Sequence, residues 1–515
     1  MRLPPSLPAL ILSLCAALPS QAAAPATSAA PQVAWLNAAG DADIERAFAQ
    51  SRAEGKPVLV YWGASWCPPC NQLKATLFNR QDFVERTRGF IAVNIDGDSP
   101  GAQKLGARFK VVGYPTLILF NVAGAELTRV PGEVDAAQVM QVLQLGLAGG
   151  RPVKTVLAEA RSGGKLTAGE WSMLAFYSWE TDEDQVAAAA ERFRVLSTLA
   201  NACPAGESKT RLRLKALAAQ EGKGAADAAS RREVLALLAD PAAARAQMDV
   251  LTGSAAEIVR ALEPKAGGSR SQLVKAFDSA LVRLEADATL SRADRLGALV
   301  ARVDLARIDQ PKDSPQPKVS TALRDEARRH AARADKEITD GYERQAVITG
   351  AGYLLGRAGL WKESDDLLKS NLAKSHSPYY LMSQLADNAR KRGHKEQALQ
   401  WYAEAFNKSE GPATRLQWGA SYLGALVDLA PGDAARIEKT ASQILGEAVA
   451  QPAAFHQRGA RSVKRVGDKL AAWSKGGAHS DVMQRLRAQL SPTCSKVGAA
   501  DGQRAACEAV LKPAA

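Results

Sequence analysis

Two cysteines separated by two prolines stand between a short apolar run and a helical pattern, and this arrangement constrains the fold more than any other feature of the chain. The run Pro57–Trp62 has the length and composition of a buried strand, and the motif Trp66-Cys67-Pro68-Pro69-Cys70 follows it closely. A helix is predicted from the motif through Phe78, because proline is tolerated in the first turn of a helix. The sequence therefore predicts Cys67 at a helix start and Cys70 one turn inside it.

Three other uses of a Cys-x-x-Cys pair agree poorly with the surrounding sequence. A zinc site needs two further Cys or His ligands at workable spacing, but the next cysteine is Cys203 and all five histidines lie beyond residue 329. Covalent haem attachment needs a histidine after the second cysteine, where this chain has Asn71. A structural disulfide would close a loop too short to remove much chain entropy. The pair therefore favours thiol–disulfide exchange, and we expect neither a metal nor a cofactor.

Thiol–disulfide exchange requires an attacking cysteine that ionises, because the thiolate is the nucleophile. The free N–H groups and the dipole at a helix start favour the thiolate. We therefore predict that Cys67 attacks a partner disulfide and that Cys70 resolves the mixed disulfide, with the pKa of Cys67 below the free-thiol value of about 8.5.

Helical patterns and apolar strands alternate on both sides of the motif. The further predicted strands are Phe90–Ile95, Pro115–Phe120 and Glu126–Val130, and the further predicted helices are Asp41–Glu54, Gly101–Phe109 and Asp135–Leu147. This alternation is typical of a central mixed sheet flanked by helices.

Residues from about 35 to 147 resemble the thioredoxin superfamily on two motifs, the Trp-Cys-x-x-Cys sequence and Gly113-Tyr114-Pro115-Thr116 before a later strand. The resemblance implies that Pro115 forms a cis peptide bond facing the cysteine pair and presents backbone to a bound substrate. It also implies that Trp66 and Tyr114 contact the substrate. The residues that make up these motifs are most similar to those of exported bacterial thioredoxin-like domains.

Two residues that this resemblance implies are replaced here. Thioredoxins carry a buried aspartate six residues before the first cysteine, assigned to proton transfer with the second; Tyr61 occupies that position. Ala92 stands in place of the family's lysine on the adjacent strand. Proton transfer at Cys70 must then use Tyr61, water or the partner. Without a histidine between the cysteines, reduction or isomerisation is favoured over primary oxidation.

The remaining sequence is helical and alanine-rich, with breaks at Gly149–Pro152 and Gln310–Pro317. A chain of 515 residues suggests roughly two to four domains. We expect a signal peptide at 1–22, a tether at 23–34, a thioredoxin-like domain at 35–148, a helical domain at 151–317, helical repeats at 318–490 and a C-terminal segment at 491–515.

The last third of the chain contains a repeat of 34 residues, which separates Gly359 from Gly393 and Pro378 from Pro412. Its small and apolar positions match the tetratricopeptide pattern over about residues 345–412, at Leu385, Ala386, Ala389, Ala398, Tyr402 and Ala405. This resemblance implies stacked helix pairs, which offer a partner-binding surface. A generic helical bundle is the alternative.

The N-terminus predicts export. A basic start, the apolar run Leu7–Leu18 and the small residues that follow it are typical of a secretory signal cleaved after Ala22. The run is shorter than the roughly 18–20 apolar residues that cross a bilayer, so we expect a periplasmic protein that is not embedded in the membrane. Basic residues scattered among acidic ones give a net charge of +12 without any nucleic-acid motif, so we expect no nucleic-acid partner.

An oxidising compartment also sets the interpretation of the other cysteines. Cys494 and Cys507 flank a predicted loop and are expected to form a structural disulfide, with two free thiols as the alternative. Cys203 is left over, either buried or available to a partner.

Taken together, these patterns predict an enzyme that reduces or isomerises disulfides of protein clients gathered by the helical region. A reductant in an oxidising compartment needs electrons, and related domains receive them from a membrane thiol donor. The alternative is a non-enzymatic scaffold in which the thioredoxin fold is only a module. The client, the donor and the oligomeric state are left open.

Overall fold

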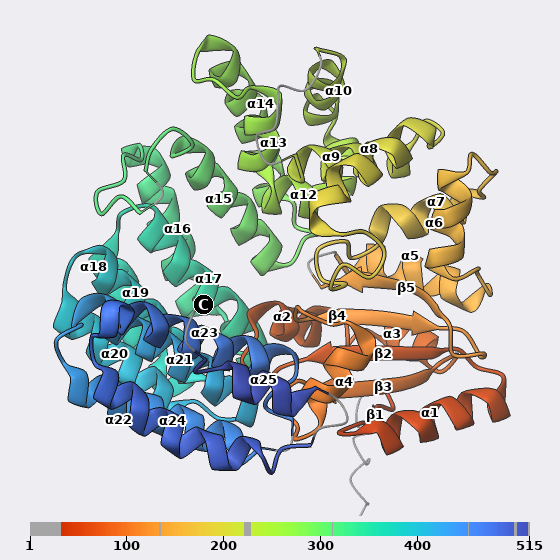
Figure 1. Cartoon of the computed structure of the whole chain (residues 1–515). Coiled ribbons are helices and arrows are strands. Elements are labelled where there is room, and N and C mark those ends of the chain that lie inside the picture. Colours follow the sequence, from red (N-terminus) through yellow and green to blue (C-terminus); the bar gives the residue numbers. More distant parts are fainter. Residues whose placement is uncertain are drawn as a thin grey trace, which may run out of the picture.

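The computed structural model describes residues 32–132, 135–220, 228–311, 313–451, 453–498 and 502–512. An α/β part is followed by helices only, so the predicted fold class, an α/β thioredoxin fold followed by an all-α region, is confirmed (Figure 1). The expected signal peptide at 1–22 and most of the tether at 23–34 lie outside the described residues. In the described part of the chain, no helix is long and apolar enough to span a membrane.

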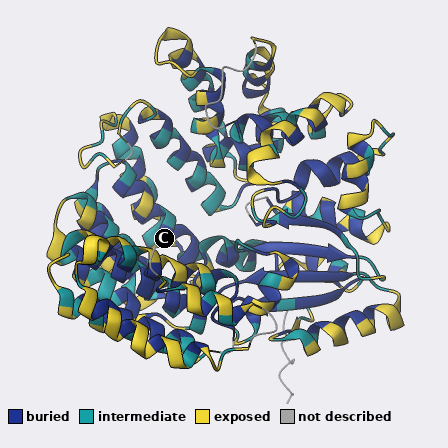
Figure 2. Cartoon of the chain, in the orientation of Figure 1, coloured by how far each residue is buried: buried dark blue, intermediate teal, exposed yellow. Residues whose placement is uncertain are grey.

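Five strands form one mixed sheet in the order β1-β3-β2-β4-β5. They are β1 Leu36–Asn37, β2 Val58–Gly63, β3 Ile91–Asp96, β4 Thr116–Phe120 and β5 Glu126–Pro131. Strands β1 and β2 run parallel to β3, whereas β4 runs antiparallel to β2 and β5. Every residue of β2 and β4 is buried, and Figure 2 shows this dark core running through the sheet. The cysteine motif follows the C-terminal end of the central strand β2.

Helices cover both faces of the sheet: α1 Asp41–Glu54 and α4 Ala102–Phe109 on one, α2 Pro68–Thr76, α3 Gln81–Thr87 and α5 Ala136–Leu147 on the other. Alternate residues of β2 serve the two faces. Val60 and Trp62 pack with α1 and α4, whereas Leu59 and Tyr61 pack with α2, α3 and α5. Strand β1 and helix α3 were not predicted, because elements of two and seven residues carry little periodicity.

The apolar core on the second face continues beyond Gly150 into four further helices. These are α6 Val153–Arg161, α7 Ala168–Phe176, α8 Arg192–Ala202 and α9 Glu207–Ala218. Their buried side chains form one cluster with Leu59 and Leu119 of the sheet. The loop after α7 also covers the edge strand β5, because the N–H of Ser178 donates to the carbonyl of Arg129 at 3.0 Å. The buried apolar residues from Val153 to Ala216 in this cluster therefore share a core with the sheet.

The next helices form an arch that leaves the β5 side of the sheet and returns to α2 (Figure 1). They are α10 Ala228–Ala239, α11 Pro241–Ala246, α12 Met248–Gly253, α13 Ala255–Leu262, α14 Gly268–Ala286, α15 Arg292–Ala306 and α16 Thr321–Glu337. The arch closes where Gln72 Nε2 of α2 donates to Asp294 Oδ1 of α15 at 2.7 Å.

The final helices form successive contacting pairs from α17 to α22, after which α23 packs on α21 and α24 packs on α22. They are α17 Gly341–Arg357, α18 Trp361–Asn371, α19 Pro378–Lys391, α20 Lys395–Lys408, α21 Pro412–Leu429, α22 Ala434–Val449, α23 Gln457–Trp473, α24 Ser480–Cys494 and α25 Gln503–Ala509. Gly359 and Gly393 close the turns inside two successive pairs at φ of 77° and 80°. That left-handed conformation favours glycine, which explains why glycine recurs at this point of the 34-residue spacing.

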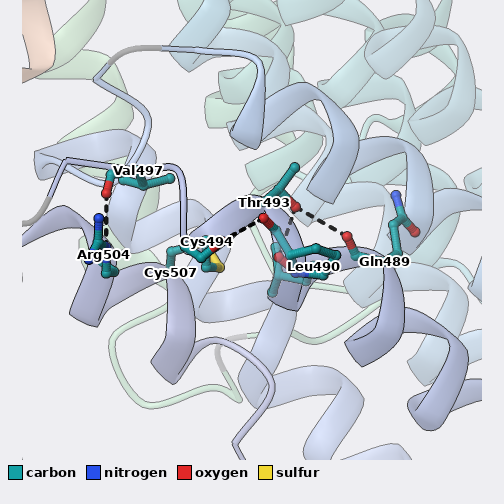
Figure 3. Close-up of a disulfide and its surroundings, with 9 residues drawn as sticks. Gln489, Leu490, Thr493, Cys494, Val497, Arg504 and Cys507 are labelled. Atoms are coloured by element: carbon teal, nitrogen blue, oxygen red, sulfur yellow. Dashed lines mark hydrogen bonds between the residues drawn. A yellow bond between two sulfur atoms is a disulfide. The ribbon is translucent and has the colours of Figure 1, made fainter.

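Cys494 and Cys507 form a disulfide that joins the end of α24 to α25 (Figure 3). Both cysteines are buried. Beside them, Arg504 Nε donates to the carbonyl of Val497 at 3.0 Å, and this bond also links the two segments. The disulfide lies in the helical region, and both of its cysteines belong to the same cluster of buried residues as Cys67 and Cys70.

Candidate active site

The structure brings the predicted cysteines together with Tyr114 and Pro115. Cys67 directly precedes the first residue of α2, and Cys70 lies in the first turn. The N–H of Cys70 donates to Cys67 Sγ at 3.4 Å, and the Cys67 thiol donates to the carbonyl of Tyr114 at 3.6 Å. The Tyr114–Pro115 peptide bond is cis. Both cysteines are free thiols in this structure.

Asn71 fixes the backbone of the motif. Its side chain is fully buried, and Nδ2 donates to the carbonyl of Ser65 at 2.7 Å and to that of Cys67 at 2.8 Å. Sequence reasoning used Asn71 only to exclude haem, because nothing local distinguishes a structural amide from an exposed one.

Tyr61 reaches the cysteine pair from β2. Its side chain lies over Gly63, where a Cβ would come within 2.2 Å of the Tyr61 hydroxyl, so this approach requires glycine. The hydroxyl is buried and has no hydrogen-bond partner among the described residues. Burial, and then the neighbouring Cys70 and Cys67, raise the pKa of Tyr61 well above its usual value. The phenol therefore stays protonated beside Cys70, where it can donate to a thiolate.

An aromatic frame surrounds the motif. The ring of Trp66 meets Tyr114 edge to face, with ring centroids 6.0 Å apart, and Tyr114 stacks on Trp62 at 6.4 Å. Trp66 Nε1 donates to Asp98 Oδ2 at 3.0 Å. The two aromatic residues expected to contact substrate, Trp66 and Tyr114, therefore lie next to each other beside Cys67.

The helical region covers this frame. Tyr380 of α19 stacks on Trp66 at a centroid distance of 5.8 Å, and Gln345 Nε2 of α17 donates to the carbonyl of Trp66 at 3.3 Å. As a result, Cys67 is only 3% exposed and Cys70 is fully buried. Sequence reasoning missed these contacts, because residues roughly 280 to 310 positions apart leave no local signal of contact.

Comparison with known proteins agrees with the geometry of the motif. A family model described as a thioredoxin-like domain matches residues 44–146. Residues 44–146 are a thioredoxin-like domain. The solved structure of oxidized thioredoxin O2 from Arabidopsis thaliana aligns with 21% of this chain and 91% of its own length, at 21% identity. Its TM-score of 0.19 is too low to bear on the fold.

Two curated relatives match about a fifth of this chain. The thiol:disulfide interchange protein DsbD of Klebsiella pneumoniae is 31% identical over 118 residues, which are 22% of this chain and 19% of that protein. The thiol:disulfide interchange protein DsbD 1 of Pseudomonas aeruginosa is 30% identical over 114 residues, 21% of this chain and 19% of that protein. The chain thus spans about a fifth of the length of these relatives.

The expectation of an acidified Cys67 is wrong for this closed arrangement. Burial raises the pKa of the Cys67 thiol well above its usual value, and Cys70 raises it further. The N–H of Cys70 lowers this pKa, as predicted for a helix start, and the ammonium of Lys74, which was not predicted, lowers it too, but both by less than burial raises it. The cover over the thioredoxin-like domain, which the sequence did not predict, reverses the direction of the shift.

Alkylation measures this reversal directly. Only the thiolate reacts with iodoacetamide, so a raised pKa leaves little reactive Cys67 at pH 7, and its thiolate fraction grows about tenfold per pH unit below the pKa. In the reduced full-length protein we expect Cys67 to react at least about tenfold more slowly than N-acetylcysteine at pH 7, with a rate still rising above pH 9. Mass spectrometry of quenched samples gives the rates. A plateau below pH 8 would contradict the raised pKa.

The other three cysteines in the described part of the chain lie in the helical region that follows the thioredoxin-like domain. Cys203 directly follows α8 as a buried free cysteine in the apolar cluster that includes the sheet, and burial raises its pKa. Cys494 and Cys507 are bonded to each other. Across the described ranges, no group of three or more His, Cys, Asp or Glu side chains is placed to hold a metal ion.

Proposed function

We propose that this protein is a thiol–disulfide oxidoreductase that reduces or isomerises disulfides of protein clients. The observation that carries the proposal is the position of Cys67 Sγ, at the start of α2 and 3.6 Å from the carbonyl of Tyr114 beside the cis Pro115. A client strand that pairs with this backbone would bring its disulfide to the sulfur. The thiol:disulfide interchange proteins that match the domain support the same chemistry.

Two displacements complete a reduction. The Cys67 thiolate attacks one client sulfur, so a mixed disulfide forms, the client S–S bond breaks, and the other client sulfur leaves as a thiolate. Cys70, once deprotonated, then attacks the Cys67 sulfur and releases the second client thiolate. The client gains two electrons, and the Cys67–Cys70 pair loses them as a disulfide. The Cys70 proton passes to water or to the client thiolate that leaves first, and we assign to the Tyr61 phenol, which stays protonated, a hydrogen bond to the Cys70 thiolate.

The setting of this reaction is part of the proposal. An exported protein in an oxidising periplasm needs a thiol donor in the membrane to reduce the pair again. The signal-like N-terminus supports this setting. The paired helices α17 to α22 are assigned to client recruitment, because stacked helix pairs present extended binding surfaces.

Insulin reduction by the mature protein with dithiothreitol tests the proposed function. We expect precipitation faster than with the reagent alone, loss of this gain in Cys67→Ser, and no change in the matched control Cys203→Ala, which removes a buried cysteine away from the motif. A reduction potential of about −270 mV for the Cys67–Cys70 pair would indicate a reductase, and one of about −120 mV would indicate an oxidase. If neither the wild-type protein nor the variant Arg458→Gln, which is designed below to uncover the motif, reduces insulin faster than the reagent alone, the scaffold alternative is favoured.

A further inference from the structure

Asp98 connects the cysteine motif to the helical region. It lies two residues beyond β3, and besides Trp66 its carboxylate accepts three hydrogen bonds from helices α21 and α23. The N–H and the hydroxyl of Thr414 donate to it at 2.9 and 2.6 Å, and Arg458 Nη2 donates at 2.6 Å. Since Trp66 directly precedes Cys67, this one carboxylate links the motif to two helices more than 300 residues away.

Arg458 closes the same contact from the first turn of α23. Its side chain is 8% exposed, and its guanidinium lies 5.1 Å from the ring centroid of Trp66 and 5.3 Å from that of Tyr114. Its backbone N–H donates to Gln103 Oε1 of α4 at 2.9 Å. Arg458 therefore contacts both aromatic residues that we expect a substrate to use.

The contact between Asp98 and Arg458 leaves some hydrogen-bond donors without partners. Arg458 Nε and Nη1 are buried with no hydrogen-bond partner among the described residues. Buried donors without partners cost free energy that water would recover. Separation of the helical region from Asp98 would hydrate these groups, which offsets part of the cost of breaking the ion pair. The contact therefore stabilises the closed arrangement by less than a fully hydrogen-bonded ion pair would, and the free-energy cost of opening is reduced.

Tyr380 lies at the edge of the closed site. One face of its ring stacks on Trp66, and the residue also lines a solvent-open hollow of about 400 Å³ together with Gln384, Tyr402 and Trp418. A shift of α19 relative to the thioredoxin-like domain would therefore place the motif in direct contact with solvent.

We propose that the helical region autoinhibits the redox pair through a clasp formed by Asp98, Thr414 and Arg458, and that the clasp opens before Cys67 meets a client disulfide. The proposal rests on the proposed function, since closure has a purpose only if the pair exchanges. In the closed state the helical region occupies the Trp66–Tyr114 surface. A client that binds the helices can then displace them from this surface, and the same movement makes the Cys67 thiol accessible to the client.

Alkylation of reduced, full-length Arg458→Gln and Thr414→Val tests the clasp at two points that do not touch the sulfurs. Because alkylation of a covered thiol requires local opening, we expect the iodoacetamide rate at Cys67 to rise about tenfold or more in Arg458→Gln and about threefold in Thr414→Val. The matched control is Arg485→Gln, which removes the same charge from an ion pair with Glu438 between α22 and α24. We expect wild-type labelling in this control, and far-UV circular dichroism shows whether each variant is folded.

The outcomes separate closure from catalysis. Labelling within twofold of wild type in both folded clasp variants would overturn the clasp, whatever the insulin assay shows. Faster labelling together with faster insulin reduction would support both proposals. Faster labelling with no insulin reduction in any variant would support closure and refute the proposed function. If Arg458→Gln does not fold, Thr414→Val decides, because it removes one hydroxyl and keeps the size of the side chain.

Discussion

Replacing Cys70 with serine is expected to turn the protein into a trap that accumulates mixed disulfides with its clients. Cys67 can still attack a client disulfide, but no second thiol is placed to release it, since Cys70 is the residue in contact with Cys67 Sγ. Cys67→Ser should form no such adducts and should lose essentially all exchange activity. Non-reducing electrophoresis of cell extracts, followed by mass spectrometry of bands that vanish with dithiothreitol, identifies the clients.

Two further variants make the trap decisive. Cys203→Ala added to Cys70→Ser should leave the adducts unchanged, because Cys203 is buried in a different part of the molecule. Arg458→Gln added to Cys70→Ser should increase their yield if the clasp limits access. Adducts that persist in Cys67→Ser would show that the roles of the two cysteines are reversed.

A chain that ends at Gly150 is expected not to fold, whereas one that ends at Gln220 should fold and reduce disulfides. The first cut removes α6 to α9, whose buried side chains share one cluster with the sheet. A fully buried Leu, Val or Phe side chain stabilises by about 1.5–3 kcal/mol, so the loss of about ten of them, roughly 15–30 kcal/mol, exceeds the total stability of a typical domain, about 5–15 kcal/mol. It also uncovers the edge strand β5, which the Ser178 segment protects.

Circular dichroism, thermal unfolding and the insulin assay compare the two chains, both beginning at Ala23. The chain that ends at Gln220 lacks α17 to α23 and hence the cover, so its Cys67 should label faster than in the full-length protein. A cooperative unfolding transition in the shorter chain, at a temperature close to that of the longer one, would show that the helices beyond Gly150 contribute little to the core.

The elements of the thioredoxin-like domain were predictable because their signals are local. The apolar run before the motif predicted β2 within one residue at each end, and the prolines between the cysteines predicted the start of α2. The cis bond at Pro115 followed from a resemblance. Each of these features is encoded within a few neighbouring residues, so one sequence suffices to find it.

The state of the site was not predictable in the same way. The pKa of Cys67 depends on burial beneath Tyr380 and its neighbours, and a helix carries no mark of which distant surface it will cover. The break at Gly149–Pro152 does end helix α5, as predicted, but a break says nothing about which core the following helices join. Both gaps concern contacts between residues far apart in the chain.

The contact between Asp98 and α21 has a consequence for that helix itself. Gly411, which precedes α21, has no side chain to serve as an N-terminal cap, and at φ of 87° a Cβ there would approach Asp98 Cγ to 2.6 Å. Asp98 therefore supplies the cap from outside, because its carboxylate accepts the N–H of Thr414 in the first turn and faces the positive end of the helix dipole. Undocking of the thioredoxin-like domain would remove this cap, which couples the stability of the first turn of α21 to the cover over the redox pair.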